Sequence, residues 1–298
     1  MLDPNKQSAT TITHIVEISE EGGILKDFLR DRYGISSRLL SKMKKRRQIL
    51  MNGAYAPYHT RIYRGDEIEM NFEEDPNDYP GVSMNLEIAY EDLDLLVINK
   101  KPGIVTHPTQ GHHKDTLING VVEYFRRIGL PMKVRFVNRL DMNTSGLIVV
   151  AKNPFAHFDL MKQMQEDQVI KTYLTWVHGR VKKDQGEIRE PIYNPEDSGG
   201  RRIIDSRGQP SKTGYQVVCR KENRSLLKVR LYTGRTHQIR VHLGFIGHPI
   251  IGDTLYGDER EERFPRQALH AFGLEFYQPR YRKKIQVEAP MPEDMETL

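Results

Sequence analysis

The spacing of apolar residues predicts a pair of short helices near the start of the chain. Apolar side chains recur at helical intervals over residues 24–29 and again over residues 39–43. Gly34 can end the first of these helices, and Ser36 or Ser37 can cap the second. We therefore expect two helices in succession before any hairpin.

Short strands and tight turns should follow these helices. The pair Asn52-Gly53 lies between two apolar runs, which is a strong signal for a two-residue hairpin turn. Gly65-Asp66 then turns the chain into residues 67–70, which alternate in polarity as a strand does. We expect residues 13–72 to form one small unit behind a flexible polar tail at residues 1–12.

The rest of the chain reads as a second, larger domain. Residues 73–84 are acidic and rich in proline and turn formers, which is typical of a linker, and the pattern is dense over residues 85–298. Residues 147–151 are apolar on both faces and predict a central strand. Asn153 as a cap and Pro154 at the first position then predict a helix.

That helix carries a stripe of large apolar side chains. Phe155, Phe158, Met161 and Met164 fall on one face, and we expect all four in the core. Elsewhere in the second domain, strands and helices do not alternate regularly. We therefore expect an α+β fold with a mixed sheet rather than a doubly wound one.

Composition narrows the class of protein further. The chain has 298 residues, of which 38% are hydrophobic, enough for a core of useful size. Its one cysteine excludes an internal disulfide and a zinc site built from several thiolates. Residues 1–11 lack the apolar core of a signal peptide, and no stretch reaches the roughly 18 apolar residues of a membrane span. We expect a soluble, cytoplasmic protein, by default a monomer.

Charge points to a polyanionic partner. The net charge of +5 is weak support alone, but six cations fall within ten residues of the second predicted helix, with no acid among them. These are Arg38, Lys42, Lys44, Lys45, Arg46 and Arg47. A solvated helix face is the alternative, but like charges repel unless a polyanion screens them. We expect this basic run to contact phosphates.

Three polar clusters could carry chemistry: residues 100–108, 138–146 and 233–243. The second is the sharpest, because Arg139 and Asp141 lie in a loop that leads into the predicted central strand.

An aspartate beside packed strands needs a cation to stay ionised, and Arg139 and Arg240 are the candidates for that partner of Asp141. The ionised carboxylate could act as a nucleophile or as a general base. A purely structural Arg–Asp pair is the alternative that spacing alone favours.

The motifs resemble those of one enzyme family. The stretch RLDMNTSGLIVVAK, residues 139–152, closely resembles the signature of the RluA-type pseudouridine synthases. The lysine-proline-glycine element at 100–108, the tyrosine element at 171–173 and TGRTHQIRVHL at 233–243 resemble further motifs of that family, in its order. The resemblance covers about residues 84–290 and implies a mixed, mostly antiparallel sheet.

The resemblance also implies roles for single residues. Asp141 would be the catalytic aspartate, and Arg240 would pair with it. Tyr173 would stack on the target base or deprotonate its carbon 5, and Ile239 would pack against Tyr173. Arg139 would fill the gap left in the RNA when the uridine is flipped out.

Further expectations concern partners and cofactors. The small first unit resembles the S4-like RNA-binding domain, and Arg235 and His107 join the residues expected at the RNA. Arginines 201, 202 and 207 surround glycine-rich turns, so we expect their loop to order on RNA. The isomerisation needs no redox step or group carrier, so no cofactor is expected. Structured RNA, ribosomal rather than transfer RNA, is the expected substrate.

One departure and several alternatives remain open. The aspartate motif of the family begins with histidine, and here Asn138 stands in that place. Asparagine cannot shuttle a proton, but it still donates and accepts hydrogen bonds. The alternatives are a transfer RNA pseudouridine synthase, an inactive RNA-binding assembly factor and a metal-dependent hydrolase. His237 and His242 are five residues apart, which is wrong for one helical face, so we expect no metal site.

Overall fold

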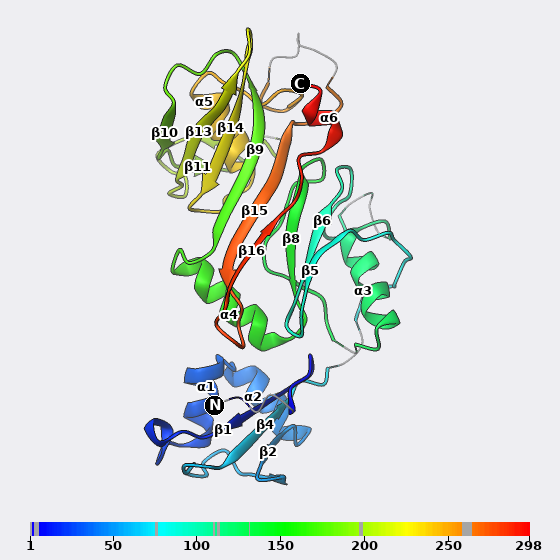
Figure 1. Ribbon diagram of the computed structural model, residues 1–298, viewed down its shortest axis with the longest axis vertical. Coiled ribbons are helices and arrows are strands. Elements are labelled where there is room, and N and C mark those ends of the chain that lie inside the picture. The colour runs from blue at the N-terminus through cyan, green and yellow to red at the C-terminus, as the bar shows by residue number, and fades with distance from the viewer. Residues whose placement is uncertain are drawn as a thin grey trace.

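The structure is a computed structural model in which a small N-terminal unit lies against one end of a long twisted sheet (Figure 1). It describes residues 2, 6–74, 77–109, 111, 114–130, 132–196, 199–257 and 264–298. Within these ranges, no helix combines the length and the apolar character that a membrane span requires.

The N-terminal unit pairs two helices with a four-stranded antiparallel sheet in the order β1-β4-β2-β3. Its elements are β1 (Thr11–Ile15), the 3-10 helix η2 (Ile18–Glu20), α1 (Leu25–Tyr33), α2 (Ser37–Lys45), β2 (Ile49–Met51), β3 (Ala54–Tyr55) and β4 (Glu67–Asn71). Gly34 ends α1 in the left-handed region with φ 62°, and the Ser36 hydroxyl accepts a hydrogen bond from the Leu39 amide, which caps α2. Both helix boundaries therefore lie where the sequence predicts them.

Two details of this unit differ from expectation. Strand β1 begins at Thr11 and pairs with β4, so the chain is ordered within the span expected to be a flexible tail. Residues 1 and 3–5 of that span lie outside the described residues. Helix α2 ends at Lys45, so Arg46 and Arg47 lie in the turn that follows it.

The second domain is built on a ten-stranded sheet with the strand order β10-β13-β14-β9-β15-β8-β6-β5, to which β16 and β7 add at β15 and β8. Its strands are β5 (Ile88–Glu91), β6 (Leu95–Lys100), β7 (Arg135–Phe136), β8 (Ser145–Ala151), β9 (Ile170–His178), β10 (Gln185–Ile188), β13 (Thr213–Arg220), β14 (Arg224–Leu231), β15 (Leu269–Tyr277) and β16 (Lys284–Glu288). Only β8 and β15 pair in parallel among the described strands. The prediction of an α+β fold with a mixed, mostly antiparallel sheet is confirmed.

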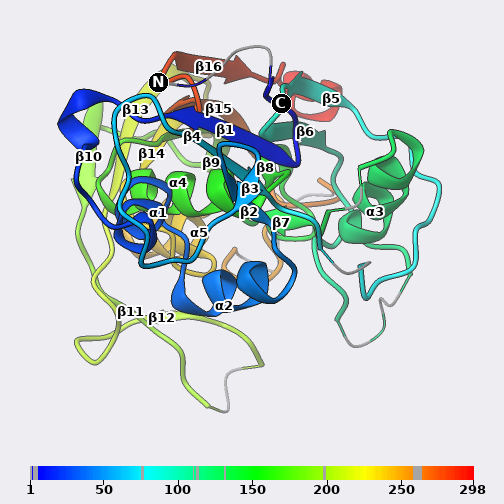
Figure 2. The same ribbon diagram turned by 90° about the horizontal axis from the view of Figure 1, so that it is seen from below.

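Helices cover parts of this sheet (Figure 1), and a two-stranded ribbon projects from it (Figure 2). The helices are α3 (Leu117–Arg127), α4 (Pro154–Gln165), α5 (Gln238–Phe245) and α6 (Glu293–Glu296). The ribbon consists of β11 (Ile192–Tyr193) and β12 (Ile203–Ile204). Helix α5 contacts β12 and β13, and α4 contacts β8 and β15.

Strand β8 lies at the centre of the core and is buried along its whole length, as its apolar pattern predicts. Gly146 at its start has φ 108°, and a Cβ added there would lie 2.3 Å from the carbonyl oxygen of Ala271 on β15. Only glycine permits this close approach of two backbones. The sequence thus sets β8 tightly beside β15, directly after the loop that carries Asp141.

Helix α4 begins as predicted, because the Asn153 side chain accepts a hydrogen bond from the Ala156 amide. The expected apolar stripe is partly wrong, however. Phe155 is buried, whereas Phe158 and Met161 are 45% and 36% exposed. The buried face of α4 instead includes the polar residues Asp159 and Gln163. The pattern of polar and apolar residues therefore predicted the wrong face of α4 as the buried one.

The segment expected to be a linker is bound to the second domain where it is described. Asn77 bonds through its side chain to the backbone of Met132 and Val134, and Glu74 forms an ion pair with Arg135. Residues 75 and 76 lie outside the described residues.

Candidate active site

Asp141 lies in the turn between β7 and β8. The Thr144 amide donates to the Asp141 carbonyl over 3.0 Å, which closes the turn and aims the carboxylate at α5. The side chain is 23% exposed, so the carboxylate is partly desolvated yet still reachable from solvent. The position suits a reactive group at the edge of a rigid sheet.

Arg240 on α5 is the cationic partner of Asp141. Its Nη1 donates to Asp141 Oδ2 over 3.0 Å. Its Nε and Nη2 donate to the two carboxylate oxygens of Asp253 over 2.7 and 2.8 Å, a bidentate clamp on a fully buried aspartate. Asp253 therefore fixes the guanidinium, which leaves one N–H edge directed at Asp141.

His237 and Tyr256 form the other side of this cluster. His237 has a left-handed backbone with φ 58°, its Nδ1 lies 2.9 Å from the Tyr256 hydroxyl, and its Nε2 lies 3.8 Å from Asp141 Oδ2. Burial, reinforced by Arg240 and opposed by Asp141, lowers the pKa of His237. The ring is thus neutral at neutral pH and does not neutralise Asp141.

Lys100 stabilises the loop that carries Asp141. Its buried ammonium donates to the carbonyl oxygens of Lys101, Ile104 and Met142 over 2.9, 3.0 and 2.9 Å. Burial lowers the pKa of Lys100 to about 7, and the charge of Asp141 opposes that shift. Three carbonyls match the three N–H bonds of an ammonium group, so this lysine ties the loop at 101–104 to the residue after Asp141.

Tyr173 and Ile239 line one small cavity with Asp141. Its volume is about 60 Å³, and Arg139, Arg235 and His237 also contribute to its wall. Tyr173 is buried, and burial together with the nearby Asp141 charge raises its pKa. Tyr173 is therefore a neutral phenol in the free protein. The structure brings together the four residues expected at the reaction centre, which are Asp141, Tyr173, Arg240 and Ile239, with Arg139 at the rim.

Two of the residues expected at the RNA, Arg139 and Arg235, line this cavity. Arg139 is exposed, and His107 is exposed with its ring edge-on to Phe136 at 5.1 Å. Arg235 borders both the cavity and a larger groove of about 460 Å³ beneath the β11–β12 ribbon. Arg202 and Arg207 line that same groove.

The basic run of the N-terminal unit faces the same side of the molecule. Seen from below, α2 lies on the side of the sheet that carries α5 and the β11–β12 ribbon, whereas β16 lies on the opposite side (Figure 2). Five of its six cations are exposed, and Lys42 is half-buried. The cavity, the groove and the basic helix thus share one face.

Asn138 has a structural role in place of the expected histidine. Its amide nitrogen donates to the Leu147 carbonyl over 3.2 Å, and its amide oxygen accepts from the Val149 amide over 2.8 Å. The side chain thereby bonds to the backbone of β8 just before Arg139. This substitution secures the loop and leaves the Asp141 cluster intact.

The sequence motifs assigned no role to Asp253 or Tyr256. Both residues follow the motif at 233–243 closely along the chain. In the described part of the chain, no three His, Cys, Asp or Glu side chains gather as metal ligands. An oriented carboxylate beside a fixed cation is what the arrangement offers.

Comparison with known proteins identifies the family. The family model described as RNA pseudouridylate synthase matches residues 94–244. The Bacillus subtilis RNA pseudouridine synthase YjbO is 36% identical over 268 residues, covering 89% of this chain and 94% of its own. Ribosomal large subunit pseudouridine synthase D of Nitrosomonas europaea is 36% identical over 260 residues, covering 84% and 75%. Among solved structures, human RNA Pseudouridylate Synthase Domain Containing 1 superposes with a TM-score of 0.58 at 31% identity, covering 71% of this chain and 85% of that one. The chain therefore belongs to the RNA pseudouridine synthases, which are isomerases.

Proposed function

We propose that this enzyme converts specific uridines of large-subunit ribosomal RNA into pseudouridine, with Asp141 as its catalytic residue. The observation that carries the assignment of the residue is the clamp of Asp253 on Arg240, which directs one N–H edge at Asp141. The choice of RNA rests on similarity to relatives named ribosomal large subunit pseudouridine synthase D.

The reaction breaks the bond from the sugar's anomeric carbon to uracil N1 and forms a bond from the same carbon to C5. The proton at C5 is lost and N1 gains one, so atoms and electrons balance without a redox partner. Asp141 acts on the sugar, either by attack on the anomeric carbon or by removal of the 2′ proton. Both routes need the ionised carboxylate, whose Oδ2 accepts a hydrogen bond from Arg240 Nη1 over 3.0 Å.

Tyr173 and Ile239 serve the base once it has left its stack. Extrusion of a base costs a few kcal/mol, which stacking on an aromatic ring offsets in part. Tyr173 lines the cavity beside Asp141 and offers both a ring face and a hydroxyl. The exposed Arg139 at the rim is placed to occupy the gap in the RNA.

The flanking strands of RNA would lie along the basic face. The groove lined by Arg202, Arg207 and Arg235 begins at the edge of the cavity, and arginine binds phosphate through planar pairs of N–H groups. At the far end, α2 and the following turn extend the same face. We assign the N-terminal unit, with its S4-like pair of helices, to RNA binding.

The test is deletion of the gene in its host, with pseudouridines mapped by chemical labelling across ribosomal and transfer RNA. Sites that vanish from large-subunit RNA and return with the wild-type gene support the proposal. Loss confined to transfer RNA would replace the target. No change in any site, together with inactivity of the purified protein on host RNA, would leave an RNA-binding protein without catalysis.

A further inference from the structure

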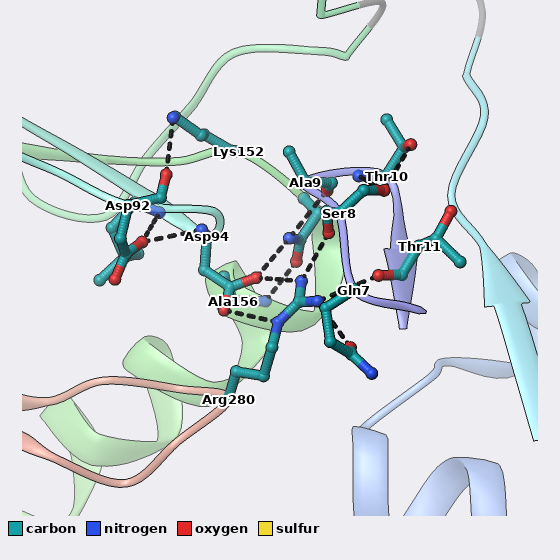
Figure 3. Close-up of polar contacts among 12 residues, drawn as sticks. Gln7, Ser8, Ala9, Thr10, Thr11, Asp92, Asp94, Lys152, Ala156 and Arg280 are labelled. Atoms are coloured by element: carbon teal, nitrogen blue, oxygen red, sulfur yellow. Dashed lines mark hydrogen bonds and ion pairs between the residues drawn. The ribbon is translucent and has the colours of Figure 1, made fainter. Parts of the chain in front are cut away.

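A buried arginine of the second domain forms an ion pair within that domain and also binds the N-terminal segment (Figure 3). Arg280, in the turn between β15 and β16, and Asp94, just before β6, are both 0% exposed at their side chains. Arg280 Nε and Nη2 donate to the Asp94 carboxylate over 3.0 and 2.6 Å. These two residues are 186 positions apart and both belong to the second domain.

The remaining N–H groups of Arg280 bind the N-terminal segment. Nη1 donates to Gln7 Oε1 and the Thr11 carbonyl over 2.8 and 3.0 Å, and Nη2 donates to the Ser8 carbonyl over 2.9 Å. A guanidinium has five N–H bonds, and all five are engaged here. Arg280 thus bonds the segment that leads into β1 with three of its five donors.

Asp94 is equally saturated. Besides Arg280, it accepts from Asn153 Nδ2 over 2.8 Å and from Gln278 Nε2 over 2.9 Å. Asn153 Nδ2 also reaches the Ala9 carbonyl over 3.1 Å. The residue that caps α4 therefore contributes to the same junction.

A second contact lies between α1 and α4. The rings of Tyr33 and Phe155 are 5.3 Å apart, and a Cβ added to Gly34 would lie 1.9 Å from the Phe158 ring. This contact explains why Phe158, although partly exposed, is a large aromatic residue. Two separate contacts, one polar and one aromatic, fix two points of the N-terminal unit and thus resist rotation about either.

We propose that Arg280 is a positioning residue for RNA recognition, holding the N-terminal unit so that α2 and Asp141 engage one RNA at a fixed separation. This inference rests on the proposed role of α2 in RNA binding. A fixed second site raises the effective concentration of the RNA at the first, whereas a loose one does not. RNAs long enough to reach α2 would gain from the junction, and short ones would not.

Spin labels test the geometry directly. Cys219, the chain's one cysteine, is exposed on β13, and Ser41→Cys adds a second labelling site on the exposed side of α2. Double electron–electron resonance on the full chain should give one narrow distance distribution. Arg280→Lys, which cannot serve both carboxylate oxygens and three further acceptors, should broaden it. Phe158→Ala, which removes the ring packed against Gly34 and leaves Arg280 and Asp94 unchanged, should broaden it too.

Kinetics tests the consequence for RNA. The substrates are an unmodified large-subunit ribosomal RNA transcript and the short stem-loop within it that carries the modified uridine. Arg280→Lys should raise KM for the long transcript about tenfold, with kcat and the short substrate unaffected. The matched control is Arg126→Lys in the second domain, whose exposed arginine pairs with Glu123 of the same helix, α3.

Replacing Lys44, Lys45, Arg46 and Arg47 with alanine separates this inference from the proposed function. Suppose that the alanine variant and Arg280→Lys each raise KM for the long transcript, and that the two combined raise KM no further than the alanine variant alone. Both the RNA-binding role of α2 and the positioning role of Arg280 then hold. If the alanine variant raises KM but Arg280→Lys and Phe158→Ala change neither KM nor the distance distribution, the positioning role of Arg280 is wrong while RNA binding by α2 stands. If the alanine variant leaves KM unchanged, the role of α2 fails and the inference fails with it.

Discussion

Arg240 Nη1 lies 3.0 Å from Asp141 Oδ2, while the other edge of the same guanidinium is held by Asp253. Asp253 is itself fully buried and also accepts from the amides of Leu255 and Tyr256. The orientation of Arg240 toward Asp141 is therefore set by a residue that does not line the cavity.

Asp253→Asn should weaken catalysis without touching the reacting atoms. The amide places a donor against the guanidinium in place of an acceptor, so the orientation of Arg240 is lost. Loss of a charge-assisted hydrogen bond of about 1.5–3 kcal/mol corresponds to a fall in kcat of roughly ten- to a hundredfold. Single-turnover isomerisation measures it, with the surface pair variant Glu275→Gln as control. An unchanged kcat would show that Arg240 keeps its place without Asp253.

Tyr173→Phe should separate stacking from proton transfer. Phenylalanine keeps the ring in the cavity and removes the one hydroxyl that Tyr173 offers to carbon 5. We expect kcat to fall by about 10² or more, the usual scale for loss of a general acid or base, with RNA affinity retained. Rates close to wild type would restrict Tyr173 to stacking. Tyr173→Leu, which removes the ring as well, serves as the reference for loss of both.

The basic turn and helix should govern the salt dependence of RNA binding. The slope of log affinity against log salt falls by about 1 for each phosphate that the protein no longer neutralises. Alanine at Lys44, Lys45, Arg46 and Arg47 should therefore weaken affinity at low salt and flatten the slope. Filter binding from low to high salt measures both. A slope equal to that of the wild type would mean that the basic run does not contact phosphate.

Stability should fall as the pH drops below about 6.5. His242 and His270 are fully buried, and burial is the largest cause that lowers the pKa of each ring below its ordinary value of 6.5. Below pH 6.5 the two histidine rings bind protons in the unfolded chain but remain neutral in the folded chain, until the pH reaches their lowered pKa. The free energy of unfolding therefore decreases with decreasing pH. Urea unfolding between about pH 7.5 and about 5 tests this, because above about pH 7 both rings are neutral in both states. A free energy of unfolding that rises toward low pH would contradict the assignment.

Local chemistry explains which elements the sequence could predict. Asn52-Gly53 predicts a hairpin turn, residues 147–151 predict a buried strand, and Asn153 with Pro154 predicts the start of a helix. Each of these patterns involves only residues that are close together in the sequence. The family motifs likewise gather Asp141 and Arg240, because their spacing reflects the shared geometry of the family. These features are properties of short segments.

Features that join distant segments were beyond such reasoning. Strand β1 was missed because its Thr13 and His14 are polar, although both are buried against β4 and neighbouring rings. The pairing of Asp94 with Arg280 spans 186 residues, and no local pattern distinguishes these two from surface charges. The prediction that Phe158 lies in the core failed for the same reason, because this side chain packs against Gly34 of the N-terminal unit.

A single substitution at Asp141 tests whether this residue performs the isomerisation. Purified wild-type protein and Asp141→Asn are incubated with RNA from a host that lacks the gene, and pseudouridine formation and RNA affinity are measured on the same samples. Asparagine keeps the shape of the side chain and removes its charge. We expect Asp141→Asn to bind the RNA and to form no pseudouridine. Substantial pseudouridine formation by Asp141→Asn would show that Asp141 is not the catalytic residue.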